Sequence, residues 1–337
     1  MKCSFRISTA AAGVAVASLI AGCGGGSAAP ASPGATGSVE KPDLTVAAVP
    51  AADAAGLYVA EQRGLFAAEG LHVKIVSVTS SATAIAGQEA GRYDVTTGNY
   101  VSYILADAQD QASLRILAEG SVMQPRAQVI LTPPGSRITD IADLKGKRIG
   151  VNVLGNIGTL LISSLLGDSG ILPSQVHFVP IPFPEMTAAL KAHAVDAAWL
   201  PEPFVSLAEQ TIGAQQLADT DQGATENFPI AGYVVTQAWA KKYPRTAAAF
   251  ERALAQGQEL ADTDRTAVEQ AMVSFIGVSK QTAAVTTIDD YPLSLDPARL
   301  QRIPDEMLRF GLLSQPFNVT LMTRGGLMRT AEVWRVA

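Results

Sequence analysis

Short apolar segments typical of β-strands alternate with helical segments along most of the chain, and this alternation constrains the fold more than any other feature. Strands joined through helices pair in parallel, and the helices cover both faces of the sheet. Up to residue 131 we expect strands at 44–49, 71–78, 93–96, 115–118 and 128–131, with helices at 57–62, 85–90 and 101–106.

The same order then repeats. A helical turn is expected at 141–144, followed by strands at 148–153, 176–179 and 197–200 and helices at 159–166, 185–192 and 202–210. After a strand at 233–236 the pattern is almost entirely helical, with helices at 246–262, 265–275 and 297–310. The fold class predicted from this pattern is α/β, with parallel sheets between layers of helices.

An internal similarity supports two related halves. Residues 85–95 and 187–197 both show a helix end, a short link and an Asp that enters an apolar strand. The two aspartates are Asp94 and Asp196. Two similar α/β lobes explain this best; a chance match between alanine-rich helices is the alternative.

The N-terminus has the features of an export signal. Lys2 and Arg6 precede an apolar run that is too short for a good membrane span. The run ends in Leu19-Ile20-Ala21-Gly22, so that two small residues stand directly before Cys23. This is the pattern of a lipoprotein signal. Residues 1–22 are therefore predicted to be removed and Cys23 to be lipidated, which would anchor the protein on the extracytoplasmic face of the cell membrane. The alternative is an ordinary signal peptide with an incidental Cys.

Residues 23–42 follow as a segment rich in Gly, Ala, Ser and Pro. Such a composition cannot bury a core, so we expect a flexible tether between the anchor and the folded body.

Charge and cysteine content exclude several classes of function. Without residues 1–22 the chain has 23 basic and 31 acidic residues and no basic cluster, so we expect no nucleic-acid partner. Its two cysteines are Cys3 and Cys23, which leaves the body without disulfides or a cysteine-ligated metal. The three histidines are scattered, and no nucleophile elbow, phosphate loop or HExxH motif is present. We therefore expect no catalytic residues, no metal and no cofactor.

Several motifs resemble one family of solute-binding proteins, those for nitrate, sulfonates, taurine and thiamine-pyrimidine precursors. The resemblance covers about residues 43 to 310. It is carried by Gly56-Leu57-Tyr58-Val59-Ala60, Gly64-Leu65-Phe66, Glu69-Gly70-Leu71, Asp143-Leu144-Lys145-Gly146-Lys147-Arg148-Ile149-Gly150, Val195-Asp196-Ala197-Ala198-Trp199 and Glu202-Pro203.

The resemblance implies a two-lobed, periplasmic-binding-protein-like fold of type II, with a ligand cleft between the lobes. Lobe 1 would be 43–132 plus 232–337, and lobe 2 would be 133–231. Two hinge crossings would fall near 131–132 and 231–232. The lobes would close on a small solute by a hinge, and the protein, a monomer, would deliver that solute to the permease subunits of an ABC importer.

In α/β sheets of this kind, ligands bind beyond the carboxyl ends of the strands, where helix N-termini also point. Such ends are expected at 53–58, 79–82 and 154–159, and strand-end loops at 98–100 and 199–204. The predicted ligand-binding residues are Asp53, Tyr58, Ser80, Ser81, Asn99, Tyr100, Asn156, Gly158, Thr159, Trp199 and Glu202.

These residues have alternative roles. Each Ser or Thr can simply cap a helix. Trp199 can stack on a flat ligand or belong to the core. Glu202 can accept a hydrogen bond from a ligand or only favour the start of its helix. The five segments contain no Lys or Arg, which favours a nitrogen-bearing ligand, such as an aminosulfonate or an amino-heterocycle, over a simple anion.

Two other functions fit the same resemblance. One is an enzyme, because thiamine-pyrimidine synthases and some menaquinone-pathway enzymes use this fold; the synthases, however, carry a cysteine cluster that this body lacks. The other is a surface lipoprotein that senses its ligand instead of transporting it. The identity of the solute does not follow from the motifs.

Overall fold

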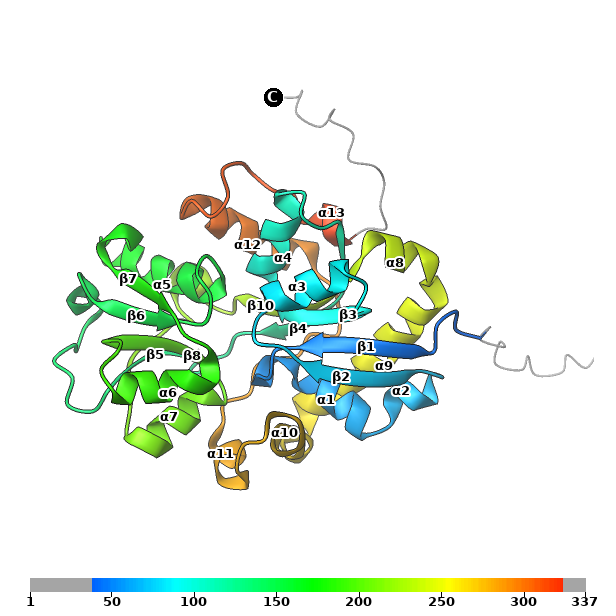
Figure 1. The fold of residues 1–337 in the computed structure, drawn as a ribbon, viewed down its shortest axis with the longest axis horizontal. Coiled ribbons are helices and arrows are strands. Elements are labelled where there is room, and N and C mark those ends of the chain that lie inside the picture. Colours follow the sequence, from blue (N-terminus) through cyan, green and yellow to red (C-terminus); the bar gives the residue numbers. More distant parts are fainter. Residues whose placement is uncertain (1–37, 324–337) are drawn as a thin grey trace, which may run out of the picture. The chain divides into compact units, whose positions relative to one another are not determined.

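Two five-stranded sheets organise the computed structural model, which describes residues 38–323 (Figure 1). The first sheet has the order β2-β1-β3-β10-β4, and the second has the order β7-β6-β8-β5-β9. The strands of the first sheet are β1 (Asp43–Ala48), β2 (His72–Ser77), β3 (Val95–Asn99), β4 (Leu114–Val122) and β10 (Pro229–Thr236). Those of the second are β5 (Gln128–Thr132), β6 (Arg148–Val151), β7 (His177–Pro180), β8 (Ala197–Pro201) and β9 (Gln215–Asp219).

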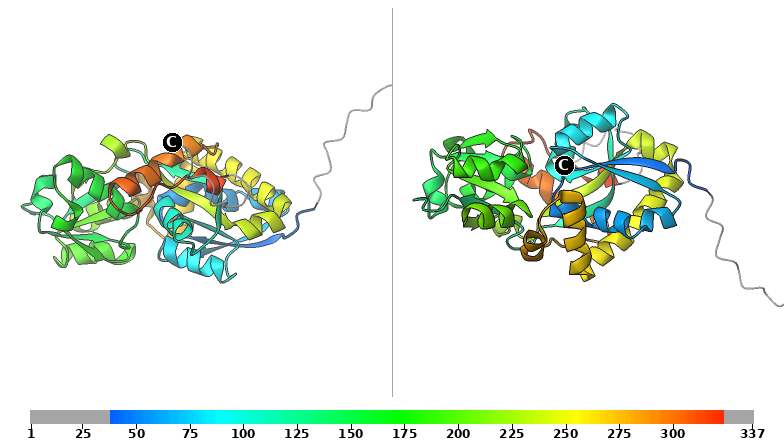
Figure 2. Two further views of the ribbon diagram at one scale, coloured as in Figure 1. Left: turned by 90° about the horizontal axis from the view of Figure 1, so that it is seen from above. Right: turned by 60° about the horizontal axis from the view of Figure 1, so that its bottom comes forward.

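Helices lie on both faces of each sheet (Figures 1 and 2). The first sheet and its helices form the first lobe, with η1 (Ala52–Ala54), α1 (Ala55–Gln62), α2 (Leu65–Ala68), α3 (Ser81–Glu89) and α4 (Tyr100–Ala108). The second lobe has η2 (Ile141–Leu144), α5 (Ile157–Asp168), η3 (Pro173–Gln175), α6 (Phe183–Lys191), α7 (Phe204–Ile212) and η4 (Gly223–Thr225). After β10 come α8 (Gln237–Lys242), α9 (Pro244–Thr263), α10 (Arg265–Ala271), η5 (Met272–Ile276), α11 (Lys280–Val285), α12 (Pro297–Arg309) and α13 (Thr320–Thr323).

The sheets are mixed, so the prediction of parallel sheets is only partly right. The pairs β1–β2, β1–β3, β6–β7 and β6–β8 are parallel. In contrast, β10 runs antiparallel to β3 and β4, and β5 runs antiparallel to β8 and β9. The chain enters these strands from the other lobe instead of through a covering helix, which reverses their direction.

The internal similarity corresponds to one structural unit that occurs in both lobes. Asp94 precedes β3 and accepts a hydrogen bond from the backbone N–H of Thr45 in β1, at 3.0 Å. Asp196 precedes β8 and accepts one from the backbone N–H of Arg148 in β6, at 2.8 Å. Each aspartate thus fixes the start of the neighbouring parallel strand, which gives the same side chain the same role in both halves.

The crossings between the lobes differ from the prediction. β4 ends at Val122 in the first sheet, and β5 already belongs to the second sheet. The return falls between β9 and β10, because β10 pairs in the first sheet from Pro229 onward. The crossings are therefore the segments 123–127 and 220–228, a few residues before the predicted positions.

Two of the C-terminal helices contact both lobes. α9 packs on α1 and α2, and α10 packs on α1. α11, however, contacts α7, and α12 contacts both α4 and α5. Both helices thus also contact the second lobe, and the assignment of residues 232–337 to lobe 1 stays a prediction.

The predicted tether is too long at its C-terminal end. The carboxylate of Glu40 accepts hydrogen bonds from the backbone N–H groups of Arg245 and Thr246, and the backbone N–H of Lys41 donates to the Thr246 hydroxyl. These contacts fix the segment against the start of α9. The predicted signal, residues 1–22, and residues 23–37 lie outside the described residues. Within residues 38–323, no helix has the length and apolarity needed to cross a membrane.

Candidate functional site

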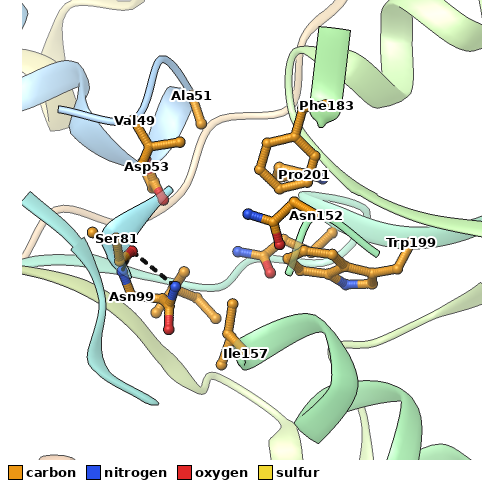
Figure 3. Close-up of a pocket in the computed structure, with 13 residues that line it drawn as sticks. Val49, Ala51, Asp53, Ser81, Asn99, Asn152, Ile157, Phe183, Trp199 and Pro201 are labelled. Carbon is orange, nitrogen blue, oxygen red and sulfur yellow. Dashed lines mark hydrogen bonds between the residues drawn. The ribbon is translucent and has the colours of Figure 1, made fainter. Parts of the chain in front are cut away.

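A pocket lies where the carboxyl ends of the parallel strands of both sheets face each other, and we call it the interlobe pocket (Figure 3). β1, β3, β6 and β8 all end at this edge. The pocket is lined by Val49, Ala51, Asp53, Ser81, Gly98, Asn99, Gln128, Asn152, Ile157, Phe183, Trp199, Pro201 and Ile230.

The first lobe supplies a polar wall. Asp53 lies in η1, just beyond the end of β1. Asn99 ends β3, and both its backbone N–H and its side-chain amide donate to the hydroxyl of Ser81, at 3.0 and 2.9 Å. Gly98 makes this approach possible, since a Cβ at that position would lie 2.3 Å from the Ser81 hydroxyl oxygen. The local sequence thus holds an amide and a hydroxyl in fixed orientation beside the Asp53 carboxyl group.

The second lobe supplies an aromatic wall and a further amide. Phe183 begins α6, and its ring centroid lies 5.9 Å from that of Trp199 on β8, with the rings tilted by 49°. Gly158 supports this wall from behind, because a Cβ there would lie 2.6 Å from Cε3 of Trp199. Asn152, just after β6, accepts a hydrogen bond from the side-chain amide of Asn156 at 2.6 Å. Figure 3 shows Phe183, Trp199 and Asn152 on the side of the pocket opposite Asp53, Ser81 and Asn99.

The crossings between the lobes close the pocket at its base. Gln128 begins β5 and pairs with Pro201 at the end of β8, so the antiparallel direction of β5 brings its first residue to this edge. Ile230 comes from the start of β10, where the chain has just returned to the first sheet. Gln128 is 1% exposed, and its Oε1 is buried without a hydrogen-bond partner in the described structure.

Asp53 is the ionisable side chain of this lining set. Burial raises the pKa of Asp53 to about 7, although the backbone N–H of Ala54 acts in the opposite direction. Within residues 38–323 no Lys, Arg or His side chain forms an ion pair with it. Nearby Asp289 is buried too, and burial, followed by the negative charge of Asp53, raises the pKa of Asp289 well above its usual range. The pocket is therefore acidic.

Four of the predicted ligand-binding residues line the pocket: Asp53, Ser81, Asn99 and Trp199. The two tyrosines do not. Tyr58 stacks on Phe275 with ring centroids 5.0 Å apart, inside the first lobe. Tyr100 is fully buried against Gly232, where a Cβ would lie 2.4 Å from its ring. Both aromatic rings are core residues because their helices turn that face toward the sheet.

The helix starts account for most of the other predicted residues. The Ser80 hydroxyl caps α3 by accepting from the backbone N–H of Thr83, and the Asn156 side chain caps α5 by accepting from that of Gly158. The Thr159 hydroxyl donates to the backbone carbonyl of Asn156 at 2.7 Å. For Ser80 and Asn156 the geometry favours a capping role, and the Thr159 hydroxyl is engaged within the first turn of α5.

Glu202 is outside the interlobe pocket, and its hydrogen bonds are all made within the protein. Its carboxylate accepts from the backbone N–H and the hydroxyl of Ser206, at 3.0 and 2.8 Å, and from the backbone N–H of Thr287, at 3.1 Å. Its carbonyl accepts from the backbone N–H of Ala52 in the first lobe, at 3.0 Å. Burial raises the pKa of Glu202, and these donors lower it. These contacts place Glu202 at the start of α7 and against the first lobe, in agreement with the alternative role at a helix start, and its contact with a ligand stays a prediction.

Of the remaining lining residues, three lie in segments that were expected to face the ligand, namely Gly98, Ile157 and Pro201, and the others do not. Asn152 follows β6 directly, so the strand-end rule applied to every strand would have found it. Phe183 opens α6 in the same way. Gln128 and Ile230 carry no such signal, because their position depends on where the chain crosses between lobes and on the antiparallel direction of β5 and β10.

The fold is that of periplasmic binding proteins. A solved example is the alkanesulfonate-binding protein SsuA from Xanthomonas axonopodis pv. citri bound to MOPS. It matches with a TM-score of 0.73 and 20% sequence identity, over 85% of this chain and 99% of that chain. The family follows from the sequence: residues 51–264, more than half of the chain, match the model of the NMT1/THI5-like family, and the protein belongs to that family.

Two relatives show the range of function within this similarity. The nitrate/nitrite binding protein NrtA of Nostoc sp. is 25% identical over 259 residues, which is 70% of this chain and 58% of that protein. The 4-amino-5-hydroxymethyl-2-methylpyrimidine phosphate synthase of Schizosaccharomyces pombe is 29% identical over 121 residues, 35% of this chain and 33% of that protein. The chain thus spans less than two thirds of the length of either relative.

Proposed function

We propose that this protein is the extracytoplasmic solute-binding component of an ABC importer, and that it captures a small organic solute in the interlobe pocket. The observation that carries the proposal is the composition of this pocket. Its walls come from the strand ends of both lobes, and its base comes from the crossings between them. A solute bound there contacts both lobes at once, so binding energy is available to bring them together.

The pocket chemistry suits binding of an organic molecule. Aromatic and aliphatic side chains such as Phe183, Trp199 and Ile157 provide apolar area, and a few amide and carboxyl groups provide orientation. This combination is typical of small-molecule sites. Relatives of the chain include the nitrate/nitrite binding protein NrtA and the bicarbonate transport ATP-binding protein CmpC, whose names support a transport role.

Export and a lipid anchor at Cys23 complete the proposal. They rest on the charged start, the apolar run and the small residues before Cys23. Labelling with a radioactive fatty acid tests them, because the label should be lost when Cys23 is replaced by Ser.

An enzyme of thiamine-pyrimidine synthesis is the second candidate, and the similarity to the Schizosaccharomyces pombe synthase favours it. That similarity covers 35% of this chain. The cysteines of this chain are confined to Cys3 and Cys23, so the folded body offers no cysteine cluster of the kind expected for the synthases. We therefore prefer the binding function.

A thermal-shift screen tests the proposed function. The panel contains taurine, alkanesulfonates, nitrate, aminopyrimidines, riboflavin and nucleobase-like compounds. A solute present at 100 times its Kd should stabilise the protein by about 2.7 kcal/mol. Asn152→Trp, which fills the pocket, should abolish the shift, whereas Gln256→Trp on the exposed side of α9 should keep it. If no compound of any charge shifts the midpoint, or if Asn152→Trp responds like the wild type, the proposal is wrong.

A further inference from the structure

The ionisation of the interlobe pocket is unusual for a site that would hold an anion. Asp53 is the ionisable residue of the lining set, and the described residues give it no basic partner. A second acid, Asp289, lies buried close enough for the charge of Asp53 to act on it. A buried carboxylate without a counter-charge is costly. A ligand that carries a positive charge would offset that cost, whereas an anion would add to it.

A second observation points to a ligand that donates hydrogen bonds. Gln128 lines the same pocket, is 1% exposed, and has a buried Oε1 without a partner. Buried acceptors of this kind are nearly always paired in native proteins. Together with the carboxylate of Asp53, this oxygen provides two acceptors in one pocket. The Gln128 oxygen and an ionised Asp53 cannot be paired by nitrate or sulfonate oxygens, which are acceptors themselves.

The aromatic wall adds a requirement on shape. The Phe183 ring packs against the rings of Trp199 and Phe204, with centroids 5.9 and 5.4 Å away. Phe183 and Trp199 face the side of the pocket that holds Asp53 (Figure 3). Aromatic faces attract both flat rings and cations. A planar ring with a cationic nitrogen satisfies the wall and the two acceptors together.

We propose that the interlobe pocket selects a flat organic cation, an aromatic ring bearing a protonated amine or amidine, whose N–H groups pair with Asp53 and Gln128. This inference rests on the proposed solute-binding function and names its ligand class. Asp53 sets the sign of the charge, Gln128 takes a second N–H, and the aromatic wall excludes solutes that are not planar.

A series of three probes with one shape and three charges tests this proposal. The probes are benzamidinium, benzamide and benzoate, each titrated calorimetrically into the full chain at neutral pH. Charged hydrogen bonds contribute about 1.5–3 kcal/mol, so benzamidinium should bind about 10- to 150-fold more tightly than benzamide. Benzoate should bind more weakly than either. Asp53→Asn keeps the shape of the side chain and should remove the preference for the cation.

The control is Asp43→Asn, an identical change at an exposed aspartate that lies outside the pocket, and it should keep the preference. The ligand class is wrong if benzamide or benzoate binds as tightly as benzamidinium, or if Asp53→Asn leaves the preference intact. It is also wrong if none of the three binds while an anionic or neutral solute of the broader screen does, a result that would leave the solute-binding function standing. If no solute of any class binds, both proposals fall.

Discussion

Replacing Glu202 by Ala is expected to lower the free energy of unfolding by about 3–5 kcal/mol, because three donors lose their acceptor in a buried place. The side chain is 4% exposed and accepts hydrogen bonds from the backbone N–H and hydroxyl of Ser206 and from the backbone N–H of Thr287. The backbone N–H of Ser206 lies in the first turn of α7, where backbone N–H groups have no acceptor within the helix. Glu202→Gln keeps one acceptor oxygen, so it should lower the free energy of unfolding by roughly half as much as Glu202→Ala does.

Urea unfolding at neutral pH measures this effect. Glu209→Ala is the matched control, since Glu209 lies in α7, which begins two residues after Glu202, and pairs with Arg126 at 3.1 Å, with 32% of its side chain exposed. A surface ion pair of this kind contributes at most about 1 kcal/mol. If Glu202→Ala unfolds within 1 kcal/mol of the wild type, the hydrogen bonds that we assign to Glu202 do not form in solution.

Asp53→Asn is expected to stabilise the ligand-free protein, and the gain should depend on pH. Burial raises the pKa of Asp53 from 3.8 to about 7, so the folded state holds its proton more tightly than the unfolded state does. The free energy of unfolding therefore falls as pH rises from about 4 to about 7. One pKa unit corresponds to about 1.4 kcal/mol, so the variant should be more stable by roughly 2–4 kcal/mol at pH 8. Below pH 4 the two proteins should be alike.

The effect of Asp53 on neighbouring ionisable groups also favours a more stable Asp53→Asn variant. Burial is the main cause that raises the pKa of Asp289 and of four buried tyrosines, Tyr58, Tyr103, Tyr233 and Tyr291, and the charge of Asp53 raises each of these pKa values further. Removing that charge also removes its repulsion of the Asp289 carboxyl group. Urea titrations at pH 4, 6 and 8 provide the measurement, with Asp43→Asn as an exposed aspartate that should show no such gain. A variant that is no more stable than the wild type at pH 8 would mean that Asp53 already has a counter-charge in the ligand-free protein.

The order of strands and helices follows well from local sequence, because the hydrophobic period and helix caps are local properties. β9 was not predicted. Its sequence, Gln215 to Asp219, has no β-branched residue, and it is a half-exposed edge strand that forms by pairing with β5. The positions of the two crossings between the lobes were not predicted correctly either. The sequences of β5 and β10 have the pattern of ordinary strands, and that pattern does not show which sheet each strand joins. Sheet membership depends on contacts between residues that are distant in sequence.

In the site, too, some residues could be predicted from local sequence and others depend on contacts between distant segments. Asp53, Ser81, Asn99 and Trp199 were predicted from a rule about strand ends, and that rule works because strand order places those ends together. Tyr58 and Tyr100 were misjudged because the rule does not tell which face of a helix meets the core. For Glu202, the local sequence pattern did not indicate the internal hydrogen bonds. Its partner Thr287 comes from a distant segment that no local pattern associates with the start of α7.

The central claim is that a solute bound in the interlobe pocket brings the two lobes together, and a distance between spin labels across the lobes tests it most directly. The chain has only two cysteines, Cys3 and Cys23, so replacing both by Ser allows labels at two chosen sites. Exposed Glu89 on α3 and Leu154 after β6 line opposite sides of one groove between the lobes. A control pair, Glu89 and Gln256, lies within the first lobe.

We predict that a saturating solute from the screen narrows the distance distribution between labels at Glu89 and Leu154 and shortens its mean by more than about 2 Å, the scale of domain movements on binding. The control pair should not change. A distribution between Glu89 and Leu154 that is the same with and without a saturating, tightly bound solute would contradict the claim.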